Sequence, residues 1–341
     1  MSLFRYRSAL IVVMAGMLAV QGCGQERDGA AGQPTVGFVT NGIASFWVIA
    51  DKGARDAAEE FDVAVEVMMP PDGVAGQKRM VQDLLARGVD GIAITPSDPE
   101  NQAGLLAEIA ANTHLITHDS DAPDSDRLVY VGMDNYEAGR MCGRLLKKAM
   151  PDGGKVVIFV GLLGQLNADL RRQGVIDELL DRSHDASRRD PVDDVLDGEK
   201  YTILDTRVDG FDFARAKAQV EDALARYPDL DAMIGLFAYN PPQILEAVRE
   251  AGKLDQITIV AFDEDDDTLQ AIKDGTVAGT IVQNPYRYGY ESVRVLAALA
   301  RGDRLVLPES KFLDIPAREI TSENVDAFWA ELKQLTSDED R

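Results

Sequence analysis

Short apolar runs alternate with longer amphipathic stretches from Thr35 almost to the end of the chain. The apolar runs are rich in β-branched residues and predict strands at 36–39, 63–69, 91–95, 114–118, 156–160, 202–205, 232–236, 257–262 and 279–283. Between them, apolar residues recur with helical spacing at 46–60, 76–87, 101–111, 136–150, 167–180, 211–226, 242–251 and 288–300. Gly88, Gly252 and Gly302 follow three of these stretches, as expected at helix C-termini. This alternation predicts an α/β fold with doubly wound parallel sheets covered by helices on both faces.

The two halves of the chain contain similar segments, which predicts two similar lobes. Residues 85–94 resemble residues 226–235, and in both a helix end turns through an Asp into an apolar strand. One strand later, Asp119 and Asp263 each follow the carboxyl end of a strand, where open α/β sheets bind their ligands. Either aspartate alone could be a helix N-cap. Two at matching positions favour a cleft shared by both lobes, and a chain of 341 residues is long enough for two lobes.

The first 23 residues differ from the rest of the sequence. Arg5 and Arg7 precede an apolar run at 9–20, which is short for a membrane span but typical of a signal peptide. Val20-Gln21-Gly22-Cys23 then resembles a bacterial lipobox, which implies lipidation of Cys23 and anchoring to the membrane by lipid. An ordinary signal peptide with an incidental cysteine is the alternative. Residues 24–34 are polar and Gly-rich, as expected of a flexible tether.

Charge and cysteine content narrow the classes of partner. The formal net charge of −23 disfavours nucleic acid, anionic lipid surfaces and an anionic ligand. With Cys23 lipidated, Cys142 has no partner for an intramolecular disulfide and is most simply a small buried side chain. Residues 181–199 are polar, charged and long for an α/β connection, which predicts a solvated surface insertion.

Catalytic motifs are missing from the sequence, so we expect a binding protein and not an enzyme. The chain has three histidines and no nucleophile elbow, phosphate loop or cluster of metal ligands, so neither metal nor cofactor is expected. His118 and Asp119 are adjacent on a strand and therefore point to opposite faces. The acidic run at 263–267 lacks the spacing of an EF-hand loop and reads as a capped helix start. A glycosidase-like carboxylate pair is the alternative that the strand-end aspartates leave open.

Several short motifs occur in an order that is characteristic of one family. They are Thr40-Asn41-Gly42 leading to Phe46-Trp47, the Ile94-Thr95-Pro96-Ser97-Asp98 turn, Thr117-His118-Asp119, Val131-Gly132-Met133-Asp134-Asn135, Asn167-Ala168-x-x-Arg171-x-x-Gly174, Phe211, Ala261-Phe262-Asp263 and Gly279-Thr280-Ile281-Val282-Gln283. From about Thr35 to Ile320 the chain thus resembles the type I periplasmic binding proteins, specifically the ribose-binding branch that serves ABC transporters.

The resemblance implies an extracytoplasmic monomer that closes two hinged lobes around a small sugar or polyol and delivers it to an ABC permease. By analogy the N-terminal lobe comprises 35–133 and 284–312, and the C-terminal lobe comprises 134–283 and 313–341. A binding protein that feeds a chemoreceptor or sensor kinase is the alternative. A repressor of the same fold would carry an N-terminal helix-turn-helix, where this chain has a signal-like segment and a tether.

A neutral sugar presents apolar C–H faces and a ring of hydroxyls, so aromatic rings and charged or amide groups recognise it. The candidate ring-face residues are Phe46, Trp47, Phe211 and Phe237, and the candidate polar ligands are Asp119, Arg171, Asp263, Gln283, Asn41, Asn167 and Asp169. The chain departs from the ribose proteins at three of their ligand positions: Ala44 replaces an Asn, Ser120 replaces an Arg, and Asp169 stands in place of another Arg. Phe237 also replaces an Asn of the family. These departures argue against ribose itself.

Overall fold

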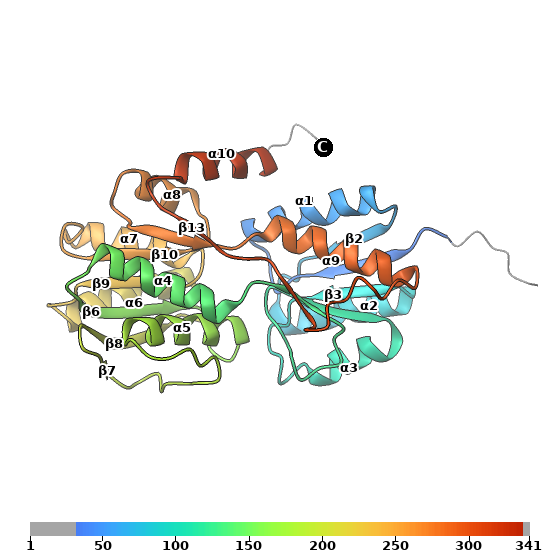
Figure 1. The fold of residues 1–341 in the computed structure, drawn as a ribbon, viewed down its shortest axis with the longest axis horizontal. Helices are drawn as coiled ribbons and strands as arrows, with labels where there is room; N and C mark the ends of the chain where they lie inside the picture. Colours follow the sequence, from blue (N-terminus) through green and yellow to red (C-terminus); the bar gives the residue numbers. More distant parts are fainter. Residues whose placement is uncertain (1–31, 337–341) are drawn as a thin grey trace, which may run out of the picture. The chain divides into compact units, whose positions relative to one another are not determined.

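The structure is a computed structural model, and it describes residues 32–336. Two sheets form the framework (Figure 1), and the chain passes from one to the other three times. The first sheet has the order β12-β5-β4-β3-β1-β2 and is parallel throughout. Its strands are β1 (Thr35–Val39), β2 (Ala64–Met68), β3 (Gly91–Ile94), β4 (His114–His118), β5 (Tyr130–Gly132) and β12 (Phe312–Asp314).

The second sheet has the order β13-β11-β10-β9-β6-β8-β7, in which only the outer strands β13 and β7 run antiparallel to their neighbours. Its strands are β6 (Gly154–Val160), β7 (Leu196–Asp197), β8 (Tyr201–Val208), β9 (Ala232–Gly235), β10 (Thr258–Phe262), β11 (Gly279–Val282) and β13 (Arg318–Ile320). Both sheets belong to the part of the chain from Gln33 onward, which forms one unit by its contacts. The predicted α/β class with doubly wound parallel sheets is confirmed.

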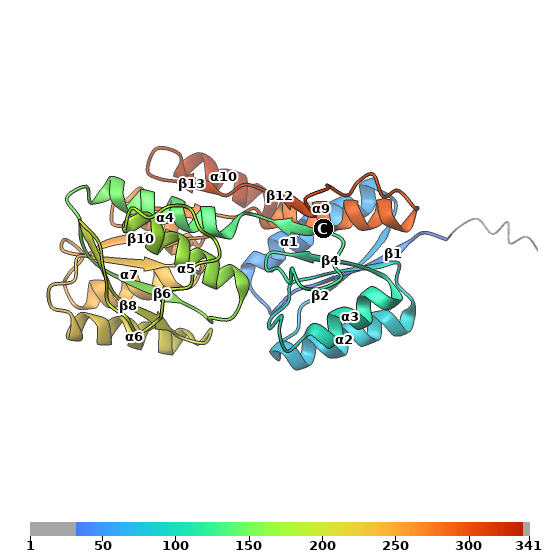
Figure 2. The same cartoon turned by 60° about the horizontal axis from the view of Figure 1, so that its bottom comes forward.

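Helices cover both faces of each sheet (Figures 1 and 2). The first sheet packs on α1 (Ser45–Glu60) and α9 (Pro285–Ala300) on one face and on α2 (Gly73–Arg87) and α3 (Ala103–Asn112) on the other. The second packs on α4 (Asn135–Ala149) and α5 (Leu166–Leu179), and on the opposite face on α6 (Phe213–Arg226), α7 (Asn240–Glu250) and α8 (Asp266–Lys273). Side chains alternate between the two cores: Val157 and Phe159 of β6 face α6 and α7, whereas Val156 and Ile158 face α4 and α5.

Each lobe contains one helix pair in backbone contact. A Cβ on Gly289 of α9 would lie 1.9 Å from the carbonyl oxygen of Ala50 in α1. In the other lobe, a Cβ on Gly174 of α5 would lie 2.1 Å from the carbonyl oxygen of Tyr136 in α4. Glycine is therefore required sterically at both crossings, and the second crossing brings the start of α4 next to the middle of α5.

The short strands β5, β7, β12 and β13 and the helix α10 (Val325–Thr336) were not predicted. Strands of two or three residues carry no readable period, because long-range pairing alone defines them. Since β12 pairs with β5 as far as Asp314, the first sheet extends past the expected lobe boundary at residue 312. Helix α10 contacts α8 beside the second sheet and also α1 beside the first.

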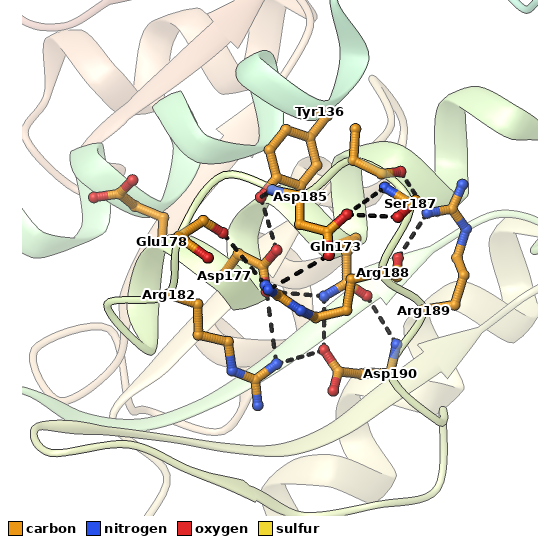
Figure 3. A network of polar contacts seen from close by, with 12 residues as sticks. Tyr136, Gln173, Asp177, Glu178, Arg182, Asp185, Ser187, Arg188, Arg189 and Asp190 are labelled. Carbon is orange, nitrogen blue, oxygen red and sulfur yellow. Dashed lines mark hydrogen bonds and ion pairs between the residues drawn. The ribbon is translucent and has the colours of Figure 1, made fainter.

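The segment 181–199 lies largely exposed at the surface, as predicted, but buried charges hold it against α4 and α5 (Figure 3). The fully buried carboxylate of Asp177 accepts a hydrogen bond from the hydroxyl of Tyr136 at 2.7 Å and pairs with Arg188 at 2.6 Å. Gln173 donates to Asp190 at 2.6 Å, and Arg182 pairs with Asp190 at the same distance. The insertion is therefore anchored, although its composition resembles that of a free loop.

Candidate functional site

Asp119 and Asp263 occupy equivalent positions at the carboxyl ends of β4 and β10. Both have a left-handed backbone, with φ of 59° and 62°. The amide of Asp119 donates to the carbonyl oxygen of Val131 at 3.1 Å, and that of Asp263 donates to Ile281 at 2.8 Å. The backbone carbonyl oxygens of the two aspartates also accept matching hydrogen bonds from hydroxyls. Tyr130 donates to that of Asp119 at 2.8 Å, and Thr280 donates to that of Asp263 at 2.7 Å. The internal similarity seen in the sequence therefore extends to the backbone conformation of both aspartates.

The guanidinium of Arg171 lies between these two carboxylates, which come from different sheets. Its Nη2 atom is 4.0 Å from Oδ1 of Asp119, and its Nη1 atom is 3.9 Å from Oδ2 of Asp263. Both distances are too long for direct hydrogen bonds. Arg171 is 1% exposed, and within the described residues its buried Nη2 has no hydrogen-bond partner. A buried donor left unpaired is costly, so this atom marks a position at which an acceptor would be stabilised.

Other contacts fix the orientation of the Arg171 side chain. Nε donates to Oδ1 of Asn135 at 2.9 Å, and Nη1 donates to the carbonyl oxygen of Leu236 at 3.3 Å. The guanidinium carbon lies 4.3 Å from the ring centroid of Phe262 and 5.5 Å from that of Phe237. One edge and one face of the guanidinium are thus held by the C-terminal lobe, while Nη2 remains available.

Gln283 lies against Asp263 at the end of β11. Its Nε2 donates to both carboxylate oxygens of Asp263, at 3.0 and 3.1 Å, and its Oε1 accepts from the hydroxyl of Tyr288 at 3.1 Å. Since Gln283 comes just before the crossing into α9, this chain of hydrogen bonds joins the candidate site to the first residues of that helix.

Burial dominates the electrostatics of the site. It raises the pKa of Asp119 to about 7, against the opposing effect of the nearby Arg171 charge. Burial also raises the pKa of Asp263, which Arg171 and Gln283 counteract. The pKa of Glu264 rises to about 8 because that carboxyl is buried beside Asp263. The pKa values of Asp119 and Glu264 therefore lie near neutral pH, and groups that donate hydrogen bonds to these carboxyls favour the ionised form.

Aromatic rings line the second sheet beside Arg171. The rings of Phe211 and Phe237 meet edge to face with centroids 5.6 Å apart. Phe211 has a left-handed backbone with φ of 64°, and its amide donates to the buried carboxylate of Asp209 at 2.8 Å. Its ring rests on Gly161, where an added Cβ would come within 2.5 Å of a ring atom. A bulky residue in this conformation is strained, so the hydrogen bond to Asp209 and the contact with Gly161 are needed to keep the ring in place.

Phe46 and Trp47 begin α1 on the first sheet, but only Phe46 remains partly exposed. Trp47 packs in the core, edge to face with His118, and its Nε1 donates to Oδ1 of Asn41 at 3.0 Å. The polar groups of Asn41 and Trp47 are therefore hydrogen-bonded to each other. Of the pair, Phe46 is the ring with surface to offer a ligand.

Asn167 and Asp169 lie in the first turn of α5, the helix that carries Arg171, and both accept hydrogen bonds from backbone amides of their own segment. Asn167 accepts a hydrogen bond from the amide of Ala168 at 2.8 Å and lines a groove beside the first crossing, with a volume of about 200 Å³. The groove is lined by Asp121, Arg127, Tyr130, Met133, Asp134, Asn135, Leu166, Asn167, Leu170 and Phe312. Asp169 accepts from the amide of Gly164 at 3.1 Å and so closes its own loop.

Sequence reasoning missed the residues that support the site. Asn135, Tyr130 and Tyr288 hold Arg171, Asp119 and Gln283, respectively, and Asp209 holds Phe211. Asn135 ends the motif at residues 131–135 and could have been found as a polar residue next to a strand end. The two tyrosines lie in apolar patterns and gave no such signal.

The carboxyl ends of the two sheets meet in this structure. Besides the approach of Arg171 to Asp119, Nε2 of Gln165 donates to the carbonyl oxygen of Ser97 at 3.0 Å.

Cys23, the expected lipidation site, lies outside the described residues, and Cys142 is a buried free thiol. Among residues 32–336, no group of three or more His, Cys, Asp or Glu side chains is arranged to hold a metal ion. Within the same range, every helix is too short or too polar to be a candidate membrane span.

Two doubly wound sheets joined by three crossings, with charged groups where their strand ends meet, define the class of two-lobed solute-binding proteins. The sequence matches the periplasmic binding protein domain family over residues 36–304, and the chain belongs to that family. It is 27% identical to the ribose import binding protein of Salmonella typhimurium over 282 residues, which cover 81% of this chain and 88% of that protein.

Solved structures agree with this assignment. An ABC transporter solute-binding protein from Burkholderia graminis, solved in complex with D-arabinose, is 27% identical, with a TM-score of 0.76 and coverage of 85% of this chain and 96% of that one. A glucose-galactose binding protein from Geobacillus stearothermophilus is 25% identical, with a TM-score of 0.76 and coverage of 86% and 98%. The prediction of a type I, ribose-binding-like solute-binding protein that acts outside the cytoplasm is confirmed.

Proposed function

We propose that the chain captures a small neutral sugar or polyol between its lobes and delivers it to an ABC permease. The observation that carries this proposal is the unpaired Nη2 of Arg171, buried between two carboxylates from different sheets. A polyol hydroxyl can donate to a carboxylate and accept from a guanidinium at the same time, so it satisfies both. The relatives named above support a sugar as the ligand, because they are a ribose import binding protein, a solute-binding protein solved with D-arabinose and a glucose-galactose binding protein.

The lobes in this proposal are 35–133 with 284–314 and 134–283 with the remaining tail, the boundary at 312 being moved to the end of β12. The ligand hydroxyls form hydrogen bonds with Asp119, Asp263 and Gln283. The apolar faces of the ligand pack on the rings of Phe46, Phe211 and Phe237. A ligand that contacts both lobes shifts the hinge toward closure by its differential affinity for the closed state. The relatives bind solutes and are not enzymes, so we expect no catalysis from this chain. Because the ribose-binding relative serves import, we favour delivery to a transporter over signalling to a chemoreceptor or sensor kinase.

A thermal-shift screen of the purified protein against D-ribose, D-arabinose, D-xylose, D-allose, D-galactose and myo-inositol tests the proposal, followed by calorimetry on each compound that raises Tm. We expect saturable binding with one ligand per chain and unchanged sugar after prolonged incubation. Asp263→Ala should weaken binding about tenfold or more, because it removes an acceptor from the buried site. The absence of any binder among pentoses, hexoses and polyols would refute the assignment.

Anchoring to the membrane through lipid on Cys23, followed by a tether at 24–34, completes the proposal. Growth with a radiolabelled fatty acid should label the wild-type chain and leave Cys23→Ser unlabelled. Equal labelling of both forms would exclude Cys23 as the anchor. We further infer a monomer, which size-exclusion chromatography with light scattering checks.

A further inference from the structure

Exposed apolar side chains concentrate at the edges of the sheets that carry the candidate site. Among the described residues, the exposed large hydrophobic side chains are Ile43, Val48, Val74, Leu162, Val195, Phe211, Phe213 and Leu305. All but Val195 and Leu305 follow the carboxyl ends of strands: three lie beyond β1 and β2 of the first sheet, and three beyond β6 and β8 of the second. We call these six residues the apolar rim. Scattered exposed hydrophobics need no explanation, but a set confined to the ligand-binding edges of two sheets does.

On the second sheet, ring contacts join the rim to the buried centre of the site. The guanidinium of Arg171 lies 5.5 Å from the centroid of Phe237, and Phe237 lies 5.6 Å from Phe211. Phe211 then lies 6.3 Å from Tyr239, which is stacked with Phe213 at 4.9 Å. Phe213 is 58% exposed. A series of ring contacts therefore connects the Arg171 guanidinium to solvent-exposed Phe213.

This aromatic surface is held by dedicated interactions. The buried carboxylate of Asp209 accepts hydrogen bonds from the amide of Phe211, from the hydroxyl of Tyr239 and from Nδ2 of Asn240. Phe211 is thereby kept in its left-handed conformation, which costs free energy for a bulky residue. Local strain that the structure maintains is characteristic of ligand-contacting segments.

On the first sheet the rim consists of aliphatic side chains. Ile43 is 68% exposed, and Val48 and Val74 are also exposed. Aliphatic groups offer neither hydrogen bonds nor a flat ring for a sugar face, so they suit an apolar group better than a second sugar. The contacts of Arg171 with Asp119 and of Gln165 with Ser97 show that the two rim-bearing edges meet.

We propose that the natural ligand is a glycoside with an apolar aglycone, which the apolar rim covers while the sugar occupies the carboxylate–arginine centre. This inference rests on the proposed function and specifies its substrate class. The aglycone lies between Phe213 and Tyr239 on one side and the aliphatic rim residues on the other. Burying such a group removes apolar surface from water and adds affinity in proportion to its area.

Calorimetry of the purified full-length protein with matched methyl and phenyl glycosides of every sugar that binds in the screen tests this inference. We expect the phenyl glycoside to bind about tenfold more tightly or better, on the scale of burying one ring. In the double variant Phe213→Ala, Ile43→Ser the ratio of phenyl to methyl affinity should fall toward one. Leu305→Ala is the matched control, since Leu305 is 96% exposed and lies outside the rim, and it should keep the wild-type ratio.

The failures are distinguishable. Phenyl glycosides that bind no better than methyl glycosides, or a preference that survives the double variant, overturn the inference and leave the sugar-binding function standing. A double variant that keeps the preference but loses sugar import would assign the rim to the permease and equally overturn it. If neither free sugars nor glycosides bind, the proposed function and the inference fall together. Circular dichroism confirms that each variant is folded.

Discussion

Nε of Arg171 donates to Oδ1 of Asn135 at 2.9 Å, and Asn135 is the residue at which α4 begins, directly after the first crossing between the sheets. The Nδ2 atom of Asn135 donates in turn to the hydroxyl of Tyr130 at 3.1 Å, and that hydroxyl donates to the carbonyl oxygen of Asp119. A continuous chain of hydrogen bonds therefore runs from the backbone carbonyl of Asp119, through the hinge, to Arg171 of the other lobe. The residues that position Arg171 for the ligand are therefore the same residues that form the first hinge crossing.

Replacing Asn135 should weaken ligand binding without removing any proposed ligand contact. In Asn135→Ala, Nε of Arg171 loses its acceptor, which is one of the contacts that orient the guanidinium, so we expect affinity to fall roughly tenfold, the scale of one hydrogen bond to a charged group. Calorimetry with a sugar from the screen measures the change. Asn112→Ala, at the exposed end of α3, is the control and should bind as the wild type. Unaltered affinity in Asn135→Ala would show that Arg171 needs no such support.

Ligand affinity should depend on pH around neutrality. Burial raises the pKa of Asp119 to about 7 in the free protein, whereas hydroxyls that donate to its carboxylate favour the ionised form. Affinity should therefore be highest above about pH 7 and fall by up to about tenfold per pH unit below it. Titrations from pH 5 to 8 check this. Asp119→Asn should flatten the profile, and Glu264→Gln separates the effect of the neighbouring carboxyl with a pKa of about 8.

The same group predicts the pH dependence of stability in the absence of ligand. The folded-state pKa of Asp119 lies above the ordinary aspartate value of 3.8, so the folded state binds the proton more tightly than the unfolded state. Its stabilising contribution is complete below about pH 4 and is lost as pH rises toward 7. Relative to Asp119→Asn, the wild-type Tm should therefore decline across this window. A difference in Tm that stays constant with pH would contradict the raised pKa.

The glycine at the crossing of α4 and α5 should be intolerant of substitution. A Cβ at Gly174 would lie 2.1 Å from the carbonyl oxygen of Tyr136, so Gly174→Ala must separate the two helices at a cost of about 1–3 kcal/mol. Thermal and urea unfolding measure the loss. Gly104→Ala in α3 is the matched control, because nothing lies within 4 Å of its Cβ position. That variant should be neutral or more stable by up to about 1 kcal/mol, since Ala is the better helix former.

The anchored insertion should contribute to stability and not to binding. Asp177 is fully buried, and removing its 2.6 Å partner in Arg188→Ala leaves a buried carboxylate with poorer compensation. We expect a loss of about 1–3 kcal/mol in unfolding free energy with unchanged ligand affinity. Arg189→Ala is the control, because Arg189 donates only to nearby exposed carbonyl oxygens. Loss of ligand affinity in Arg188→Ala would give the insertion a role at the site.

Periodicity was sufficient for the framework of this fold. Each predicted strand is present, because short runs rich in β-branched and apolar residues between helical stretches favour strands. The three-residue β5 and β12 were out of reach, since strands this short show no period and are defined by their pairing, β5 with β4 and β12 with β5. The equivalence of Asp119 and Asp263 was readable from the internal similarity. That Trp47 is satisfied by Asn41, or that Asn167 faces the groove beside the hinge, depends on side-chain packing that no spacing encodes.

The sequence by itself determined the alternation of strands and helices, the two lobes and the strand-end aspartates, because these follow from local hydrophobic pattern and chain direction. The tertiary structure decided which groups meet. Arg171 lies 36 positions from Asn135 and more than 50 from Asp119. The close crossing of α4 and α5 brings it to Asn135, and the meeting of the two sheets brings it to Asp119. Helix crossings and the meeting of two sheets are set by the packing of the whole chain, which is why the unpaired Nη2 of Arg171 was visible only in three dimensions.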